Sequence, residues 1–160
     1  MFRIKKDLLS PETLKQIKEN ISTDIFPWYY KKALTHGKKS DGTMFQHYLY
    51  RTGRPSSNYF SIVEDYFKEH LDYKALVLAR INFNLSQNKP IYSRFHKDES
   101  YPCKTALFYI NTTNAVTIFK NGKKVAGEEN TLVLFESMIE HKIQFNTDGK
   151  ERYVINFNYF

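Results

Sequence analysis

The hydrophobic positions of residues 1–73 mostly follow helical spacing. Ser10 precedes Pro11, and a serine cap followed by a proline at the first helical position typically begins a helix. The apolar residues that follow predict a helix over residues 11–20. A longer stripe of the same kind predicts a second helix over residues 57–71. In the same part, the polar residues 37–42 predict an exposed loop, and residues 44–50 are compatible with a strand.

Beyond residue 73 the pattern changes to the alternation of apolar and polar residues that is typical of strands. Asn121-Gly122 is a strong signal for a hairpin turn. The alternation predicts strands over residues 75–85, 105–110, 115–120, 131–135 and 151–160. Helices first and short strands afterwards indicate an α+β domain built on an antiparallel sandwich or open barrel. A length of 160 residues is typical of a single domain.

Two of the predicted strands place polar residues on one face and apolar residues on the other. In the strand over residues 75–85, Asn82 and Asn84 share a face with Arg80. The corresponding face of the last strand carries Arg152, Val154, Asn156 and Asn158. A strand with an apolar outer face and a polar inner face implies a lined cavity. The asparagines are therefore candidates for the cavity wall, or for ordinary buried amides that bond to the backbone.

The composition indicates the cellular environment of the protein more clearly than it indicates the reaction. The net charge is +7, which favours either solubility or attraction to an anionic partner, and the lysines are scattered along the chain. Cys103 is the only cysteine, so an internal disulfide is excluded and a reducing, cytoplasmic setting is expected. The first residues do not resemble a signal peptide, and no apolar run is long enough to cross a membrane, so no membrane partner is expected.

The candidate chemistry begins with His96-Lys97-Asp98. On a strand or at its exit, the first and third of these side chains point the same way. His141, which follows another predicted strand, is the best candidate for a third ligand. Two imidazoles and one carboxylate form the facial triad of non-haem Fe(II) oxygenases, which leaves positions on the metal open for a keto acid and O₂. A histidine and an aspartate at this spacing are common by chance, so the site needs support from further residues.

Arg152 supplies that support. It opens the last predicted strand at one end of the polar face. A guanidinium there can bind a carboxylate through two parallel hydrogen bonds. The competing interpretation is a surface ion pair of Arg152 with Asp148 or Glu151.

The order of these residues resembles the prolyl 4-hydroxylase-like branch of the 2-oxoglutarate/Fe(II)-dependent oxygenases. The shared order is His-x-Asp, a distal histidine, and Arg-Tyr at the start of the last strand. Residues 104–111 are similar to the strand that follows the first motif in that branch, and residues 130–135 to the strand before its distal histidine. The resemblance covers residues 75–160. In the N-terminal half, the aromatic segments 26–30 and 45–50 resemble short members encoded by marine bacteriophages.

The resemblance implies one domain over residues 1–160. Its core, residues 74–160, is expected to be a double-stranded β-helix (jelly-roll, cupin-like), flanked by N-terminal helices in the supporting residues 1–73. The implied cofactors are Fe(II), 2-oxoglutarate as co-substrate, O₂, and ascorbate as an optional reductant. Asn84 stands near the position where the branch commonly has a tyrosine that binds the co-substrate. The implied metal ligands are His96, Asp98 and His141, the implied co-substrate ligands are Arg152, Tyr109, Asn84 and Thr105, and the cavity wall is assigned to Asn82, Asn156 and Asn158.

The prime substrate is the least determined part of this prediction. The resemblance favours hydroxylation of a prolyl or other peptidyl side chain, with release of succinate and CO₂. Free amino acids and nucleobases stay open, and nucleic acid is not favoured because no dedicated binding motif is present. The alternatives are a cupin-like metal-binding enzyme that uses no keto acid, and a non-catalytic binding module. The sequence leaves open the oligomeric state and whether His47 or the region of Trp28 contacts the substrate.

Overall fold

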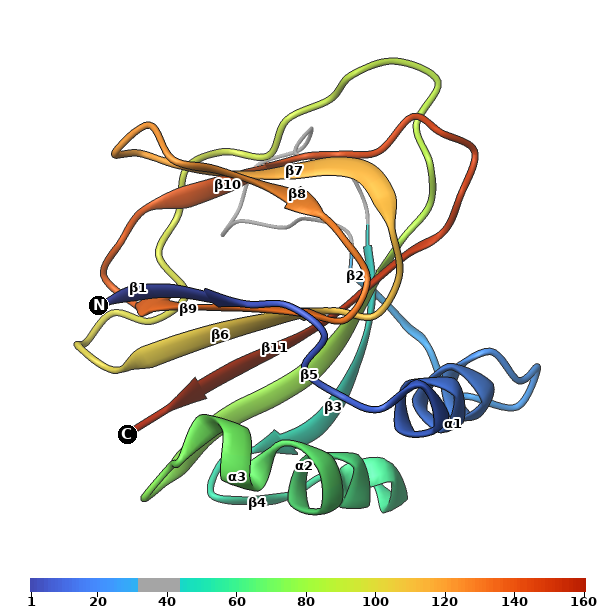
Figure 1. The fold of residues 1–160 in the computed structure, drawn as a ribbon, viewed down its shortest axis with the longest axis vertical. Coiled ribbons are helices and arrows are strands. Elements are labelled where there is room, and N and C mark those ends of the chain that lie inside the picture. The colour runs from blue at the N-terminus through green and yellow to red at the C-terminus, as the bar shows by residue number, and fades with distance from the viewer. Residues whose placement is uncertain (32–43) are drawn as a thin grey trace.

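Two facing antiparallel sheets form most of the protein in the computed structural model, which describes residues 1–31 and 44–160 (Figure 1). The loop predicted over residues 37–42 lies outside the described residues. The larger sheet has eight strands, in the spatial order β1 (Phe2–Lys5), β9 (Thr131–Glu136), β6 (Lys104–Tyr109), β11 (Arg152–Tyr159), β5 (Leu76–Asn84), β3 (Met44–Arg51) and β2 (Tyr29–Lys31), with β4 (Arg54–Pro55) paired to β3. The smaller sheet has the order β10 (His141–Gln144), β7 (Thr113–Phe119) and β8 (Lys124–Gly127).

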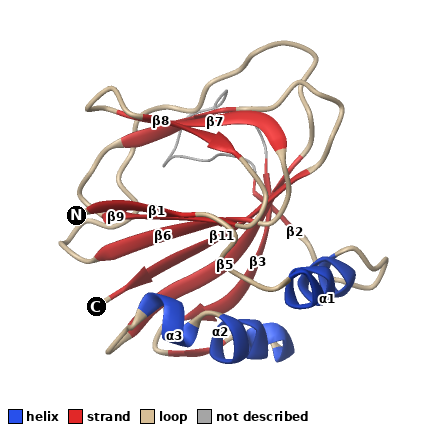
Figure 2. Cartoon of the chain, viewed as in Figure 1, coloured by secondary structure: helices blue, strands red, loops and turns tan. Residues whose placement is uncertain are grey.

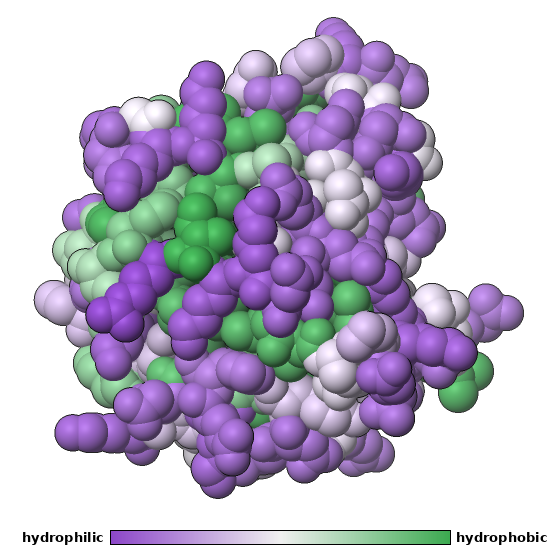
Figure 3. Space-filling view, in the orientation of Figure 1, coloured by the Kyte–Doolittle hydropathy of each residue, from purple (hydrophilic) through white to green (hydrophobic). Residues whose placement is uncertain are grey.

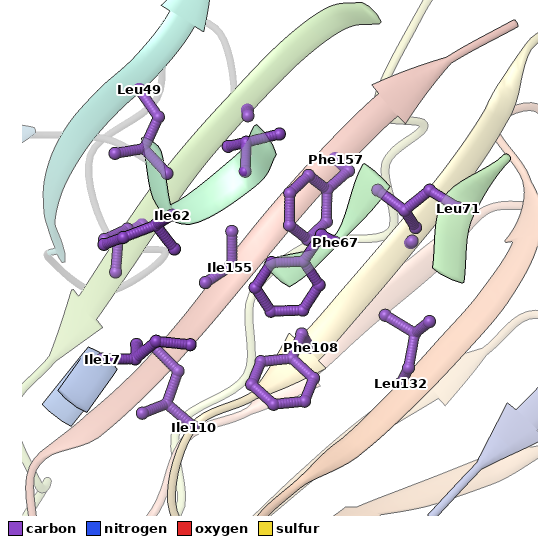
Figure 4. Packing of buried hydrophobic residues seen from close by; sticks show 14 of the residues in the cluster. Ile17, Leu49, Ile62, Phe67, Leu71, Phe108, Ile110, Leu132, Ile155 and Phe157 are labelled. Carbon is purple, nitrogen blue, oxygen red and sulfur yellow. The ribbon is translucent and has the colours of Figure 1, made fainter. Parts of the chain in front are cut away.

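Helices cover the face of the larger sheet that points away from the smaller one (Figure 2). They are α1 (Pro11–Ile21), the 3-10 turn η1 (Asn58–Phe60), α2 (Ser61–Tyr66) and α3 (Lys68–Leu71). The main core lies between this helical layer and the sheet. In it, the buried ring of Phe67 packs against Phe108 and Phe157, with ring centroids 4.9 and 5.0 Å apart (Figure 4). Removing each such side chain from water contributes on the order of 1.5–3 kcal/mol to stability.

A second, smaller apolar cluster lies between the two sheets. Its members come from β6, β7, β8, β9 and β11, and they are Leu107, Tyr109, Phe119, Val125, Val133, Phe135 and Val154. The cluster fills only part of the space between the sheets, which leaves room for the cavity that holds the candidate site.

The face of the molecule drawn in Figure 3 is mainly hydrophilic. Hydrophilic residues cover most of the face shown in Figure 3, and the hydrophobic residues there form a broken band and not one continuous patch. Ion pairs of Lys6 with Glu128 and of Lys18 with Glu129 connect the N-terminal segment to the turn between β8 and β9. None of the helices in residues 1–31 and 44–160 is both long and apolar enough to cross a lipid bilayer.

The helical predictions are confirmed in part. α1 begins where expected, and the Ser10 hydroxyl accepts the amide N–H of Thr13 at 3.2 Å. The prediction of one helix over residues 57–71 is wrong, because the segment divides into η1, α2 and α3. The break between α2 and α3 falls at Phe67, whose φ of −118° departs from the usual helical value of about −63° while its ring enters the core. Asp72, with a left-handed φ of 49°, then ends α3.

The predicted strands of the C-terminal half are confirmed to within two residues at each end. The short strands β1, β2, β4, β8 and β10 were not predicted individually, although the Asn121-Gly122 turn does connect β7 to β8. β1 pairs with β9, with Phe2 opposite Phe135. Strands from both halves of the chain therefore share the larger sheet, and the N-terminal half contributes more than helical support.

Candidate metal centre

His96 and His141 lie side by side because their backbones pair. The segment 92–96 runs antiparallel beside β10, and the amide N–H of each histidine donates to the carbonyl of the other at 3.0 Å. The centroids of the two imidazole rings are 4.6 Å apart. Two histidines from distant parts of the sequence thus lie next to each other.

The imidazole nitrogens are oriented for metal binding. Nδ1 of His96 lies 3.1 Å from the Arg94 carbonyl oxygen, and Nδ1 of His141 lies 3.2 Å from that of Ile139. Because a carbonyl can only accept, each Nδ1 carries the hydrogen, and Nε2 of the neutral ring keeps its lone pair. Burial, and after it the neighbouring His141, lowers the pKa of His96 and favours its neutral ring. Both Nε2 atoms face Asp98, at 3.9 Å from Oδ1 and 3.8 Å from Oδ2 respectively.

Asp98 is an ionised carboxylate whose side chain is only 2% exposed. Burial raises the pKa of Asp98. The neighbouring His141, Arg80 and His96 outweigh burial, so the pKa lies below its usual value. The amide Nδ2 of Asn156 lies 3.4 Å from Oδ2 and also supports the ionised form. When both imidazoles are neutral, the deprotonated carboxylate lies beside two nitrogen lone pairs, and this electron-rich site suits a cation.

The donor set fits a ferrous ion. The ligand atoms of His96, Asp98 and His141 all lie within 4.8 Å of one another. Ligand atoms at adjacent positions on a metal with bonds of about 2.1 Å are about 3 Å apart, so a small contraction of the three side chains suffices. Two imidazoles and one carboxylate on one side of the ion are the donor set of non-haem Fe(II) sites. That these residues bind iron stays a prediction.

A cavity of about 500 Å³ opens beside the three residues, between the two sheets. Its wall comes from β2, β3, β5, β6 and β11 of the larger sheet, from β7 and β10 of the smaller sheet, and from residues 93–98. This volume lies in the range of small-molecule sites. The predicted site residues that line the cavity are His96, Asp98, His141, Arg152, Asn84, Asn82 and Asn156.

Arg152 lies at one end of the cavity with a buried charge. Its Nη1 donates to Oδ1 of Asn84 at 3.2 Å, while its Nε has no hydrogen-bond partner. No acidic side chain in the described part of the chain pairs with it, so the surface ion pair with Asp148 or Glu151 does not form. Burial lowers the pKa of Arg152 to about 10, so the side chain stays charged at neutral pH. A buried guanidinium without a counter-charge favours an anionic ligand.

Tyr109 lies behind the cavity wall. It is 1% exposed, its ring centroid is 5.7 Å from the guanidinium carbon of Arg152, and its hydroxyl lies 2.8 Å from Oγ1 of Thr117. Thr117, which was not predicted as a site residue, lines the cavity in its place. The direct contact of Tyr109 with the co-substrate stays a prediction.

Thr105 and Asn158 form a buried polar pair away from Arg152. The Thr105 hydroxyl donates to Oδ1 of Asn158 at 2.8 Å, and Nδ2 of Asn158 donates to Glu99 at 3.2 Å. Neither residue lines the cavity. Because β6 is antiparallel to β11, the start of β6 pairs with the end of β11, opposite to the end that carries Arg152. The expectation that Thr105 shares a pocket with Arg152, and that Asn158 forms cavity wall, is corrected by this register.

His47 and Trp28 both contact the helical side of the larger sheet. The Nδ1 of His47 lies 2.7 Å from the Pro27 carbonyl oxygen, and its Nε2 lies 2.6 Å from Oγ of Ser57. Trp28 packs against Phe83, with ring centroids 5.2 Å apart. Neither residue lines the cavity, which favours a structural role for both.

Four cationic residues of the cavity were also missed as site residues: Arg80, Lys31, Lys97 and Lys142. The signal for Arg80 was present, because the alternation of β5 places it on the same face as Asn82 and Asn84. Lys31 lies on β2, which the sequence pattern did not reveal.

Comparison with known proteins gives no match by sequence but clear matches by fold. No family model and no curated protein sequence matches the chain. Among solved structures, a prolyl hydroxylase from Trichoplax adhaerens, in complex with a hypoxia inducible factor oxygen degradation domain peptide fragment, has a TM-score of 0.71 at 13% identity, over 99% of this chain and 83% of that chain.

Two further solved structures extend the comparison. A viral collagen prolyl hydroxylase from Paramecium Bursaria Chlorella virus-1, in its 2-oxoglutarate complex, has a TM-score of 0.62 at 13% identity, over 98% of this chain and 94% of that chain. A non-haem α-ketoglutarate-dependent carbocyclase of nogalamycin biosynthesis has a TM-score of 0.70 at 10% identity, over 99% of this chain and 78% of that chain. The protein therefore has the jelly-roll fold of the 2-oxoglutarate/Fe(II) oxygenases.

Proposed function

We propose that the protein is a non-haem Fe(II)- and 2-oxoglutarate-dependent dioxygenase that hydroxylates an organic substrate. One observation carries the proposal: a cavity wall holds a His-Asp-His donor set together with a buried, uncompensated Arg152. A metal site alone fits many functions. A metal site that shares a cavity with a buried guanidinium fits a co-substrate that chelates a metal at one end and carries a carboxylate at the other.

Each residue of the site would have a separate role. His96, Asp98 and His141 would hold the metal, with the two Nδ1–H donors on backbone carbonyls fixing the imidazoles in the required tautomer. Arg152 would bind the distal carboxylate of 2-oxoglutarate, and Asn84 would orient the guanidinium. Bound Fe(II) and 2-oxoglutarate supply the chemistry that inserts one atom of O₂ into a C–H bond and the other into succinate, with release of CO₂.

The substrate part of the proposal is a prolyl or other peptidyl side chain. Its support is the motif order together with the prolyl hydroxylases among the structural neighbours. The carbocyclase neighbour has the same fold, so a small-molecule substrate stays open. Ascorbate as reductant, a cytoplasmic location and a bacteriophage origin stay predictions.

The test is an anaerobic titration of the protein with Fe(II) and 2-oxoglutarate, followed by exposure to O₂ and measurement of succinate. A chelated keto acid should produce a charge-transfer absorption band that needs both components. His96→Ala and His141→Ala should lose the band and the succinate, whereas His70→Ala, a histidine on α3, serves as the matched control and should keep both. Metal binding without a 2-oxoglutarate-dependent band would instead indicate a cupin-like metal site that uses no keto acid.

A further inference from the structure

The cavity wall is strongly basic. Within the described residues, Asp98 is the only acidic residue that lines it. The cationic residues that line it are Lys31, Arg80, Lys97, Lys142 and Arg152. An excess of one sign of charge in a cleft with low-dielectric walls attracts ligands of the opposite sign.

This step rests on the proposed function: the metal and co-substrate of such an oxygenase would not neutralise the excess of positive charge in the cavity wall. The distal carboxylate of 2-oxoglutarate would neutralise Arg152. Asp98 and the second carboxylate of the co-substrate would together balance the two charges of Fe(II). The remaining four cations of the wall would keep their charge, so the cavity would still favour an anion.

Among these four, Arg80 is close enough to the candidate metal ligands for its charge to act on both Asp98 and His96. It sits on the inner face of β5, directly opposite Asn156 of β11, and Asn156 in turn bonds to Asp98. Arg152 lies four residues away along β11, which at about 3.3 Å per residue corresponds to about 13 Å. The two arginines therefore stand at different positions along the cavity wall, and a co-substrate bound to Arg152 leaves Arg80 available to a second reactant.

Arg80 has an unmet hydrogen-bonding requirement. Its Nε is buried without a partner, and no acidic side chain of residues 1–31 and 44–160 lies within ion-pair distance. A half-buried cation, Lys31, faces the same cavity. Burial, and after it the charge of Arg80, lowers the pKa of Lys31, so the two like charges are close enough to repel each other. An anion between them would relieve that repulsion and satisfy the guanidinium.

We propose that Arg80, assisted by Lys31, forms a second anion-binding subsite that holds a carboxylate or phosphate group of the prime substrate next to the metal centre. A neutral prolyl side chain alone would leave this subsite unmatched. The subsite therefore defines the substrate class as one with an oxyanion close to the carbon that reacts. The source of the oxyanion, a carboxylic acid or a phosphate ester, is distinguished by the experiment.

Binding can be measured without turnover, with probes that share a phenyl ring and differ in charge. The protein is saturated with 2-oxoglutarate to occupy Arg152 and is then titrated calorimetrically with benzoate, phenyl phosphate and benzamide. We expect benzoate or phenyl phosphate to bind at least about tenfold more tightly than neutral benzamide, because hydrogen bonds to a charged group are involved. The anion with the higher affinity identifies the source. Equal affinity for all three probes overturns the proposal.

Substitutions assign the subsite to Arg80. Arg80→Gln should weaken the preferred anion about tenfold or more, Arg80→Lys should recover part of the affinity, and the exposed Arg3→Gln on β1 should bind like the wild type. If Arg80→Gln does not fold, Lys31→Gln carries the same test and should weaken the anion in the same direction. Loss of anion binding in Arg152→Gln but not in Arg80→Gln assigns the anion to the co-substrate end and overturns the proposal.

Failure of this subsite and failure of the proposed function have different signatures. A protein that consumes no 2-oxoglutarate with Fe(II) and O₂ contradicts the oxygenase proposal, whatever it does with benzoate. A protein that yields succinate but shows no preference for anionic probes contradicts only the subsite.

Discussion

The amide Nδ2 of Asn156 lies 3.4 Å from Oδ2 of Asp98, so the last strand supports the candidate metal-binding carboxylate through one hydrogen bond. The strand position explains why this contact is available. Asn156 faces inward from the middle of β11, whereas Asp98 lies in the segment that follows His96 beside β10. The contact thus joins the larger sheet to the segment that carries two of the three candidate ligands.

Asn156→Ala should weaken metal binding about 10- to 100-fold, the usual cost of losing a group that orients a ligand. The measurement is a titration of the protein with Fe(II) under anaerobic conditions or with Mn(II) in air. Asn158→Ala is the matched control, since Asn158 lies two residues further on the same strand but bonds to Glu99 and Thr105. An equal loss of affinity in both variants would mean that the strand as a whole, and not the Asp98 contact, supports the site.

Arg152→Met should separate two effects of the buried charge: its effect on the stability of the fold and its effect on the binding of 2-oxoglutarate. Removal of a buried guanidinium without an acidic partner should leave the melting temperature unchanged or raise it, because an apolar side chain needs no counter-charge. Affinity for 2-oxoglutarate should fall by about 2 kcal/mol or more, roughly thirtyfold, because the distal carboxylate loses its cation. Calorimetric titration and thermal unfolding measure the two effects on the same samples. A large fall in stability with unchanged 2-oxoglutarate affinity would make Arg152 a purely structural residue.

The inner face of the cavity could be predicted from the sequence because the alternation within one strand is a local property. Arg80, Asn82 and Asn84 on β5 share a face whatever the rest of the chain does. The same holds for Arg152 and Asn156 on β11. The burial of Arg152, its hydrogen bond to Asn84 and the lack of an acidic partner for it among the described residues could be learned only from the structure.

Several features that depend on the meeting of distant segments could not be predicted. Thr117 reaches the cavity only because the smaller sheet folds over the larger one. Thr105 was expected near Arg152, but the antiparallel register of β6 with β11 places it at the other end. The break at Phe67 follows from packing against Phe108 and Phe157, and helical spacing alone contains no sign of it.

His47 should make the stability of the protein depend on pH. Its Nδ1–H donates to the Pro27 carbonyl, and its Nε2 accepts from the Ser57 hydroxyl, which itself accepts the amide N–H of Tyr59. Burial lowers the pKa of His47 from its ordinary value of 6.5. The unfolded chain therefore binds a proton more readily, so the stabilising contribution is present above pH 6.5 and is lost as the pH falls below it.

The measurement is the melting temperature of the wild type and of His47→Asn between pH 5 and pH 8. The wild type should lose stability on acidification more steeply than the variant, because the variant has no group to protonate at this position. Parallel curves for the two proteins would rule out His47 as a source of the pH dependence.

Thr117 and Tyr109 should act on the co-substrate as a pair, with Thr117 in direct contact. Their hydroxyl oxygens are 2.8 Å apart, and only Thr117 lines the cavity. Thr117→Val, which keeps the shape but removes the hydroxyl, should therefore weaken 2-oxoglutarate binding more than Tyr109→Phe does. In the double variant the losses should not add, because each single substitution already breaks the shared hydrogen bond. Calorimetric titration of the four proteins measures the coupling. A larger loss in Tyr109→Phe, with additive effects, would instead support the direct contact of Tyr109 that the sequence predicted.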